Sequence, residues 1–184
     1  MKRLRYAVLV LLGLAGVTLI VGSLMPGTYD VQRTVEIRAP IEVVFAQVHD
    51  LRKHEAWAPW RKADPSYVFT YGDKTVGPGA TMSWKGESSS GSMRMARSRP
   101  PNAIENHLHS PGMGDTIGHW TFEPSPAGTK VTWRFTGDIS GPVGSWMAVF
   151  MDVMLGPFFD EGLASLTEVA EKAALPAEAT ATSP

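Results

Sequence analysis

The chain begins with a short basic segment that is followed by a long stretch without charge. Ala7 to Met25 are nineteen positions with no charged side chain. A helix of that length roughly spans the ~30 Å hydrocarbon layer of a bilayer, and its apolar residues form no one-sided stripe. The pattern predicts a transmembrane anchor within residues 1–26.

The charges before this run predict its orientation. Lys2, Arg3 and Arg5 precede the apolar segment closely, and positive flanks remain on the cytoplasmic side. In a bacterium we therefore expect a single-pass inner-membrane protein with a cytoplasmic N-terminus and a periplasmic domain. A cleaved signal peptide ending near Val21-Gly22-Ser23 is the alternative. The apolar run exceeds the ~7–15 residues usual in signal peptides, which favours the anchor, and both readings export the domain.

A change of hydrophobic period follows the anchor. Thr28 to Arg38 alternates between apolar and polar residues, which predicts a strand with one buried face. After Pro40, apolar residues at helical spacing predict a short amphipathic helix: Ile41, Val44, Phe45 and Val48. The polar, proline-punctuated segment 49–65 predicts a second short helix or turn that carries Trp57 and Trp60.

The middle of the chain reads as strands separated by turn residues, which is typical of an antiparallel sheet built from hairpins. With the first strand these segments make seven: Ser66–Tyr71, Ala80–Lys85, Ser92–Ser98, Ala103–His109, Thr116–Glu123 and Lys130–Thr136. From Pro142 to Leu175 the apolar spacing becomes helical and predicts one long helix. Residues 28–175 thus form one domain, and the small, polar tail 176–184 is expected to be disordered.

Alternation along the predicted strands assigns the side chains that face inward. Among the residues of this face only Asn106 is polar: Ala80, Met82, Trp84, Met93, Met95, Ile104, Asn106, Leu108, Trp120, Phe122, Val131, Trp133 and Phe135. Methionine adapts to exchangeable apolar neighbours, a property of apolar binding surfaces. Two interpretations remain open at this point, a solid core and a core that encloses a pocket.

Composition removes several classes of function. The chain of 184 residues has a formal net charge of −1, and the part after the basic N-terminus stands at −4, which is unfavourable for binding a nucleic-acid backbone. There is no cysteine, so disulfides, thiolate metal sites and cysteine nucleophiles are excluded. Nothing in the sequence requires a cofactor.

The order of elements resembles the SRPBCC superfamily, the polyketide cyclase/dehydrase and lipid-transport group that includes START and Bet v 1 relatives. The likeness covers about Thr28 to Ala174 and rests on these segments: VEIRAPIEVVFAQVHDLRKHEAWAPW, VGPGATMSW, GSMRM, TFEPSPAGTKVTWRF and GPFFDEGLASLTEVAE. It implies an α+β helix-grip fold, in which a seven-stranded antiparallel sheet wraps around the long C-terminal helix and two short helices follow the first strand.

The resemblance also implies a cavity between sheet and helix that holds a hydrophobic small molecule or lipid. The residues then expected to contact this ligand are Trp57, Trp60, Tyr71, Met82, Trp84, Met93, Met95, Asn106, Trp133, Phe135, Phe150 and Met154. Family members include binders, transporters and enzymes, so the resemblance predicts the fold better than the chemistry.

Three other functions compete with simple binding. A cyclase or dehydrase needs a buried acid or base; the inward face offers no carboxylate or histidine, so the sequence favours binding and leaves an enzyme as the alternative. A metal site would need His107, His109 and His119 to meet on the outer face; no metal is expected, because no ligand motif supports them. A protein-interaction module would use the short strand near residues 66–71 as a free edge, with no partner indicated.

Overall fold

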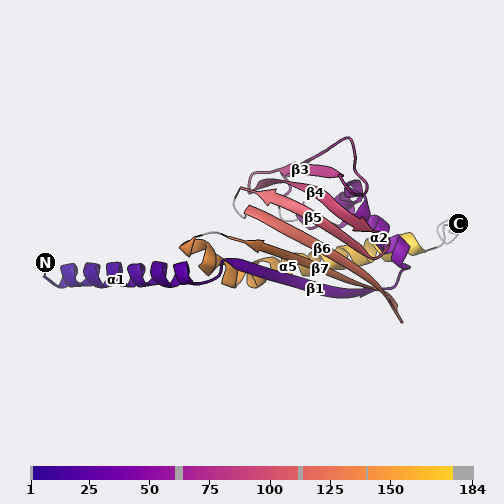
Figure 1. Cartoon of the computed structure of the whole chain (residues 1–184). Helices are drawn as coiled ribbons and strands as arrows, with labels where there is room; N and C mark the ends of the chain where they lie inside the picture. Colours follow the sequence, from indigo (N-terminus) through magenta and orange to yellow (C-terminus); the bar gives the residue numbers. More distant parts are fainter. Residues whose placement is uncertain (1, 61–63, 112–113, 140, 176–184) are drawn as a thin grey trace, which may run out of the picture.

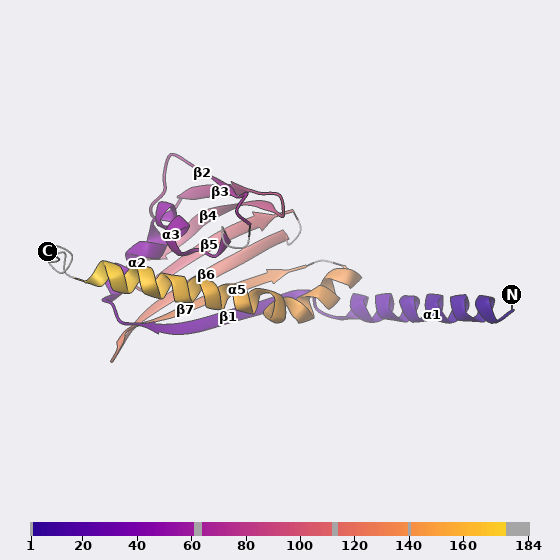
Figure 2. The ribbon, with the colours of Figure 1, turned by 180° about the vertical axis from the view of Figure 1, so that it is seen from behind.

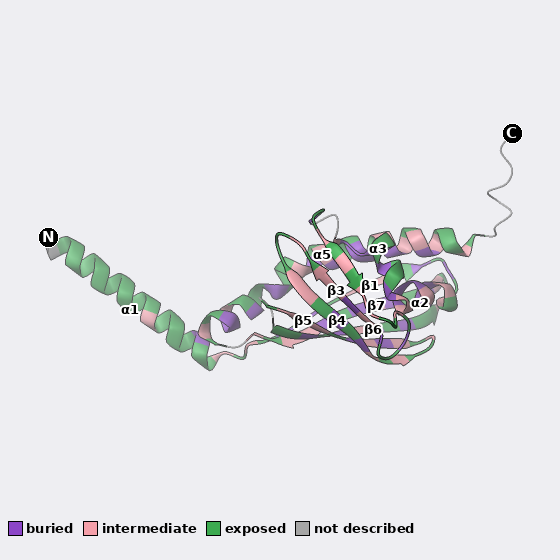
Figure 3. Cartoon of the chain, turned by 90° about the horizontal axis from the view of Figure 1, so that it is seen from above, coloured by how far each residue is buried: buried purple, intermediate pink, exposed green. Residues whose placement is uncertain are grey.

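The computed structural model describes residues 2–60, 64–111, 114–139 and 141–175 (Figure 1). The first helix, α1 (Lys2–Leu24), projects from one end of the domain (Figures 1 and 2). Its side chains are exposed along nearly the whole helix (Figure 3). In length and apolar composition α1 can span a bilayer; the long C-terminal helix α5 (Pro142–Ala174) passes the same test, but it lies against the sheet instead.

Seven strands form one antiparallel sheet, as the alternating pattern predicted. Its spatial order is β1-β7-β6-β5-β4-β3-β2. The strands are β1 (Thr28–Ile37), β2 (Val68–Tyr71), β3 (Thr81–Lys85), β4 (Ser90–Arg99), β5 (Ala103–Ser110), β6 (Gly114–Ser125) and β7 (Gly128–Asp138). The first strand thus returns to pair with the last one, and β2 is left at the opposite edge.

Short helices fill the connection between β1 and β2. They are α2 (Ile41–His49), the 3-10 turn η1 (Leu51–Lys53) and α3 (His54–Trp57). Val44, Phe45 and Val48 of α2 are buried, which confirms the predicted amphipathic face. Helix α5 crosses the inner face of the sheet beside β1 (Figure 2). The α+β helix-grip architecture is therefore confirmed.

Strands β4, β6 and β7 are longer than predicted, whereas β2 is shorter. The strand was expected from Ser66 but begins at Val68. Ser66 instead donates hydrogen bonds from its amide and its hydroxyl to the carboxylate of Asp64, so these residues form a turn. The predicted disordered tail, 176–184, lies outside the described residues.

The inward face of the sheet is apolar, as predicted. Val31, Met95, Ile104, Phe122, Val131 and Trp133 are at most 2% exposed, and Asn106 is a buried polar side chain among them. Trp133 stacks on Phe159 of α5 with ring centroids 4.2 Å apart, and a Cβ on Gly162 would meet the Trp133 ring at 2.9 Å. At this end the sheet and α5 are in close contact, so any hollow must lie elsewhere along the helix.

Candidate functional site

A cavity of about 510 Å³ lies between the inner face of the sheet and the middle of α5. This volume is within the roughly 300–1,000 Å³ range typical of small-molecule pockets. Its lining comes from strands β3 to β7, from α5 and from the loops beside them: Trp60, Tyr67, Met82, Trp84, Ser88, Ser89, Ser90, Met93, Leu108, Ser110, Pro111, Thr116, Phe135, Met154, Leu155 and Phe158.

One wall of the cavity is aromatic. The ring of Trp60 lies 5° from parallel to that of Trp84, with centroids 6.4 Å apart, and it also contacts Phe158 of α5 at 4.7 Å. The long side chains of Met82, Met93 and Met154 line the cavity as well. Such a surface offers dispersion contacts and adaptable shape, but no charge.

The other side of the cavity carries hydroxyl groups. Ser88, Ser89 and Ser90 come from the β3–β4 connection and the start of β4, and the hydroxyl of Tyr67 shares hydrogen bonds with Ser88 and Ser89. Thr116 Oγ1 lies 2.6 Å from the hydroxyl of Tyr29, whose pKa is raised by burial. Neutral hydrogen-bonding groups of this kind fix the orientation of an amphipathic molecule without requiring it to be charged.

The β3–β4 connection is held in place by Asp64. One carboxylate oxygen accepts hydrogen bonds from Ser66, and the other accepts from the amide and the hydroxyl of Ser88 at 3.0 and 2.6 Å. These hydrogen bonds hold the pKa of Asp64 well below its usual range. Asp64 is therefore a charged anchor for the serine side of the cavity, although it does not itself line it.

Half of the residues expected at the ligand line this cavity. They are Trp60, Met82, Trp84, Met93, Phe135 and Met154. Trp57, Met95 and Trp133 are instead packed in the core, at most 2% exposed. Tyr71 donates from its hydroxyl to Glu55 and is not part of the lining, and Phe150 is 57% exposed on α5.

Asn106 lies in the core between Met95 and Gly118 on the neighbouring strands. It is 2% exposed, and its Oδ1 has no hydrogen-bond partner. The Nε1 of Trp133 is likewise buried without a partner. Buried polar atoms normally find partners, so Asn106 Oδ1 and Trp133 Nε1 are two exceptions on the inner face of the sheet.

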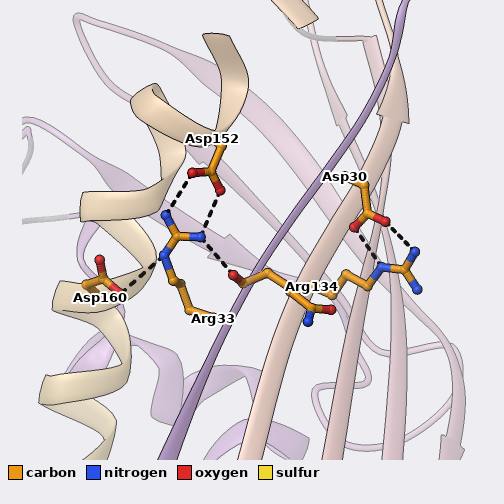
Figure 4. Close-up of polar contacts among 6 residues, drawn as sticks. Asp30, Arg33, Arg134, Asp152 and Asp160 are labelled. Carbon is orange, nitrogen blue, oxygen red and sulfur yellow. Dashed lines mark hydrogen bonds and ion pairs between the residues drawn. The ribbon is translucent and has the colours of Figure 1, made fainter. Parts of the chain in front are cut away.

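The prediction overlooked the hydroxyl side of the cavity and the charged contact between β1 and α5. Arg33 has the same parity as Val31 and Val35 and turns toward α5, where its guanidinium binds Asp152 at 2.8 and 3.1 Å and Asp160 at 3.4 Å (Figure 4). A Cβ on Gly156 would overlap this guanidinium. The alternation of β1 could have indicated that Arg33 shares a side with Val31 and Val35. Nothing in the sequence indicated that Asp152 and Asp160 would be its partners.

The outer face of the sheet holds the three histidines considered for a metal site. The β5–β6 register pairs His119 with Glu105 and His109 with Asp115, and His107 contacts Glu105 at 3.0 Å. Within the described ranges no three such side chains gather into a metal-binding group. A more open hollow of about 640 Å³ shares Met82, Met93, Leu108 and Thr116 with the inner cavity. Its other lining residues include Arg94, His107 and Asp115, so this hollow carries charged side chains that the inner cavity does not.

Comparisons with known proteins agree with this fold. The family model described as polyketide cyclase / dehydrase and lipid transport matches residues 28–171. A protein of Rhodobacter sphaeroides aligns with 17% identity and a TM-score of 0.58, over 80% of this chain and 94% of that one. Protein Ms6760 of Mycobacterium smegmatis aligns with 20% identity and a TM-score of 0.54, over 84% and 93%.

A third solved structure comes from a biosynthetic locus. DynU16, a putative protein in the dynemicin biosynthetic locus, is 15% identical with a TM-score of 0.56; the alignment covers 79% of this chain and 48% of DynU16. Sequence identities this low support a similarity of fold and nothing more. No match was found among curated proteins.

Proposed function

Because the chain belongs to the polyketide cyclase/dehydrase and lipid-transport family, we propose that it binds a hydrophobic small molecule or lipid in the cavity between the sheet and α5. The observation that carries this proposal is the cavity of about 510 Å³ with its largely apolar lining. A buried apolar surface of this size takes up molecules that water excludes.

The lining favours an amphipathic ligand with a large apolar part. The tryptophan, methionine and phenylalanine side chains would pack against that part, and the hydroxyls of Ser88, Ser89 and Ser110 would meet a small polar end. The described lining contains no carboxylate, lysine, arginine or histidine. A fatty acyl chain or an isoprenoid with a neutral polar end fits this distribution, because no fixed charge opposes its burial.

The proposal also includes a location at the membrane. Helix α1 would anchor the chain as a single-pass protein of a bacterial inner membrane, with the basic N-terminus in the cytoplasm and residues 28–175 in the periplasm. An anchored binding domain stays where apolar ligands are concentrated. It would collect or release them at the membrane surface.

Turnover of an apolar substrate is the second candidate, since the family model is named partly for cyclases and dehydrases. Tyr67 is the titratable side chain in the described lining, and its hydroxyl is hydrogen-bonded to Ser88 and Ser89. An enzyme would have to use this hydroxyl as its acid or base. Binding requires no such group, which is why we favour binding.

Native mass spectrometry of the full chain, released from detergent after purification from membranes, tests the proposal. Leu108→Trp adds bulk to a residue of the lining, whereas Ile117→Trp adds the same bulk to the exposed outer face of β6. We expect a co-purifying apolar molecule on the wild type and on Ile117→Trp, and its loss from Leu108→Trp at unchanged melting temperature. Equal retention by both variants, or a wild type without such a molecule, would contradict the proposal.

A further inference from the structure

The first half of α5 exposes an apolar face that nothing within the described chain covers. The exposed fractions are 65% for Val143, 57% for Phe150 and 73% for Val153. We define the α5 apolar face by its exposed apolar residues: Val143, Met147, Val149, Phe150, Val153 and Met154. No charged residue occurs between Pro142 and Met151. Exposed apolar patches of this kind mark interaction surfaces.

The same side of the helix becomes charged farther along. At 100° per residue, Asp160, Glu161 and Glu168 fall on the side that Val143 and Phe150 occupy, and all three are exposed. A helix that is exposed to water throughout would carry polar residues along the whole of its outer side. The change occurs past Pro157, so it marks a boundary along the helix between an apolar and an aqueous environment.

The apolar end of α5 lies against α1. Nε1 of Trp146 donates a hydrogen bond to the carbonyl of Thr18 at 3.0 Å, and the hydroxyl of Ser145 donates to the carbonyl of Met25 at 3.1 Å. A Cβ on Gly22 would overlap the carbonyl oxygen of Pro142, so this glycine permits the close approach. The first turns of α5 therefore lie beside the last turns of α1 (Figures 1 and 2).

We propose that the α5 apolar face is a second membrane contact of this chain, placed in the acyl–headgroup boundary of the leaflet from which α1 emerges. The proposal rests on the anchor role given to α1 above. Thr18 is within the uncharged run of α1, so a side chain that reaches its carbonyl is at the depth of the lipid. Lipid, rather than a second copy or another protein, is the occupant because the face continues directly from α1.

This contact would set how the cavity faces the bilayer. Met154 belongs to the α5 apolar face and also lines the cavity, and Leu155 and Phe158 follow it in the lining. An apolar ligand that leaves the leaflet along this face would therefore reach the cavity without crossing bulk water. Such a route avoids the free energy of transferring the ligand's apolar part into water, which rises with every exposed CH₂ group.

Depth-dependent quenching tests the proposal with the full chain. The protein contains no cysteine, so single cysteines can carry an environment-sensitive fluorophore at Val143→Cys, Phe150→Cys and Val153→Cys. Leu9→Cys in α1 is the membrane-embedded control, and Glu168→Cys on the charged part of α5 is the aqueous one. The variants are reconstituted into phosphatidylcholine–phosphatidylglycerol vesicles that contain nitroxide-labelled phosphatidylcholine.

We expect blue-shifted emission and strong quenching at Val143, Phe150 and Val153, as at Leu9, and neither effect at Glu168. Quenching at Leu9 with water-like emission at the three test positions would overturn the proposal and leave the anchor intact. Blue-shifted emission without quenching would also overturn it, because protein would then cover the face. Absence of quenching at Leu9 would overturn both the anchor and the contact, whereas ligand binding in the cavity is decided separately by mass spectrometry.

Discussion

The indole of Trp60 lies nearly parallel to the indole of Trp84, 6.4 Å from it between ring centroids. The first residue follows α3 in the chain and the second is in β3, so the pair links the helical connection to the sheet across one wall of the cavity. Trp60 also contacts Phe158 of α5. Helical connection, sheet and C-terminal helix thus meet at one aromatic cluster, which defines the apolar side of the proposed binding site.

Replacing Trp84 should alter ligand retention more than stability. Trp84 is only partly buried and lines the cavity, so Trp84→Ala removes ligand contacts and enlarges the hollow. Trp57→Ala is the matched control. Trp57 is 2% exposed, donates to the carbonyl of Gln47 and packs on Trp120; its loss should cost about 3–5 kcal/mol of unfolding free energy.

Native mass spectrometry and thermal unfolding, measured on the same two preparations, check this contrast. We expect Trp84→Ala to lose or exchange the co-purifying molecule with a small change in melting temperature, and Trp57→Ala to melt much earlier. Full retention of the same ligand by Trp84→Ala would contradict a role of the aromatic wall in ligand binding.

Asp64 should control the serine side of the cavity without touching the ligand. Asp64→Asn replaces an acceptor-only carboxylate that receives hydrogen bonds from both Ser66 and Ser88. We expect faster amide hydrogen exchange across residues 86–90 and weaker ligand retention, by about tenfold if one charge-assisted hydrogen bond is lost. Asp73→Asn, at an exposed position in the loop after β2, is the control and should leave both measurements unchanged.

Arg33 should hold the first half of α5 against β1. Its guanidinium binds Asp152 and lowers the pKa of that carboxyl. It also contacts Asp160, which follows Asp152 farther along α5 (Figure 4). Arg33→Gln is therefore expected to speed hydrogen exchange in residues 147–160. Arg134, which binds Asp30 on the outer face with the same two-bond geometry, provides the control variant Arg134→Gln. Equal exchange in the two variants would assign Arg33 no special role in seating the helix.

Burial of His54 predicts a loss of stability in acid. The side chain is 3% exposed, its Nε2 lies 2.8 Å from the carbonyl of Val48, and burial lowers the pKa of the imidazole to about 4. The folded state then binds fewer protons than the unfolded state between pH 4 and 6.5. Its contribution is fully present above pH 6.5 and declines by about 3 kcal/mol as the pH falls to 4, at roughly 1.4 kcal/mol for each unit.

Urea unfolding followed by tryptophan fluorescence at pH 7 and pH 5 measures this effect. His54→Gln should flatten the pH dependence, while His107→Gln, at an exposed site on the outer face, should not. Some dependence should persist in both variants, because desolvation also lowers the pKa of His49. An unchanged pH profile in His54→Gln would show that His54 is not the group responsible.

Much of the fold was visible in the alternation of the sequence. Met82, Met93, Ile104, Phe122 and Val131 lie on the inner face because residues two apart in a strand share a side. The six strands that follow the short helices were likewise visible from the turn residues that separate them. These patterns are local, so each can be read from the residues of a single strand or helix.

The parts of the site that escaped prediction depend on contacts between distant segments. Asp64 and Ser88 are 24 positions apart, and Arg33 and Asp152 are 119 positions apart; no local period links such pairs. The rotation of α5 is another case. Phe150 was expected at the ligand, but the small residues Gly144, Ala148 and Gly156 face inward and turn Phe150 outward.

Photo-crosslinking with a diazirine-bearing fatty alcohol, whose polar end is uncharged, shows whether the cavity between the sheet and α5 receives an apolar ligand. The full chain is irradiated in vesicles that contain the probe, and adducts are mapped by peptide mass spectrometry. We expect adducts at Trp60, Phe135 and Phe158, which line this cavity and not the more open hollow, and their loss in Leu108→Trp. Adducts confined to α1 and to the exposed residues of α5 would contradict this expectation, since the lipid would then touch the protein without entering it.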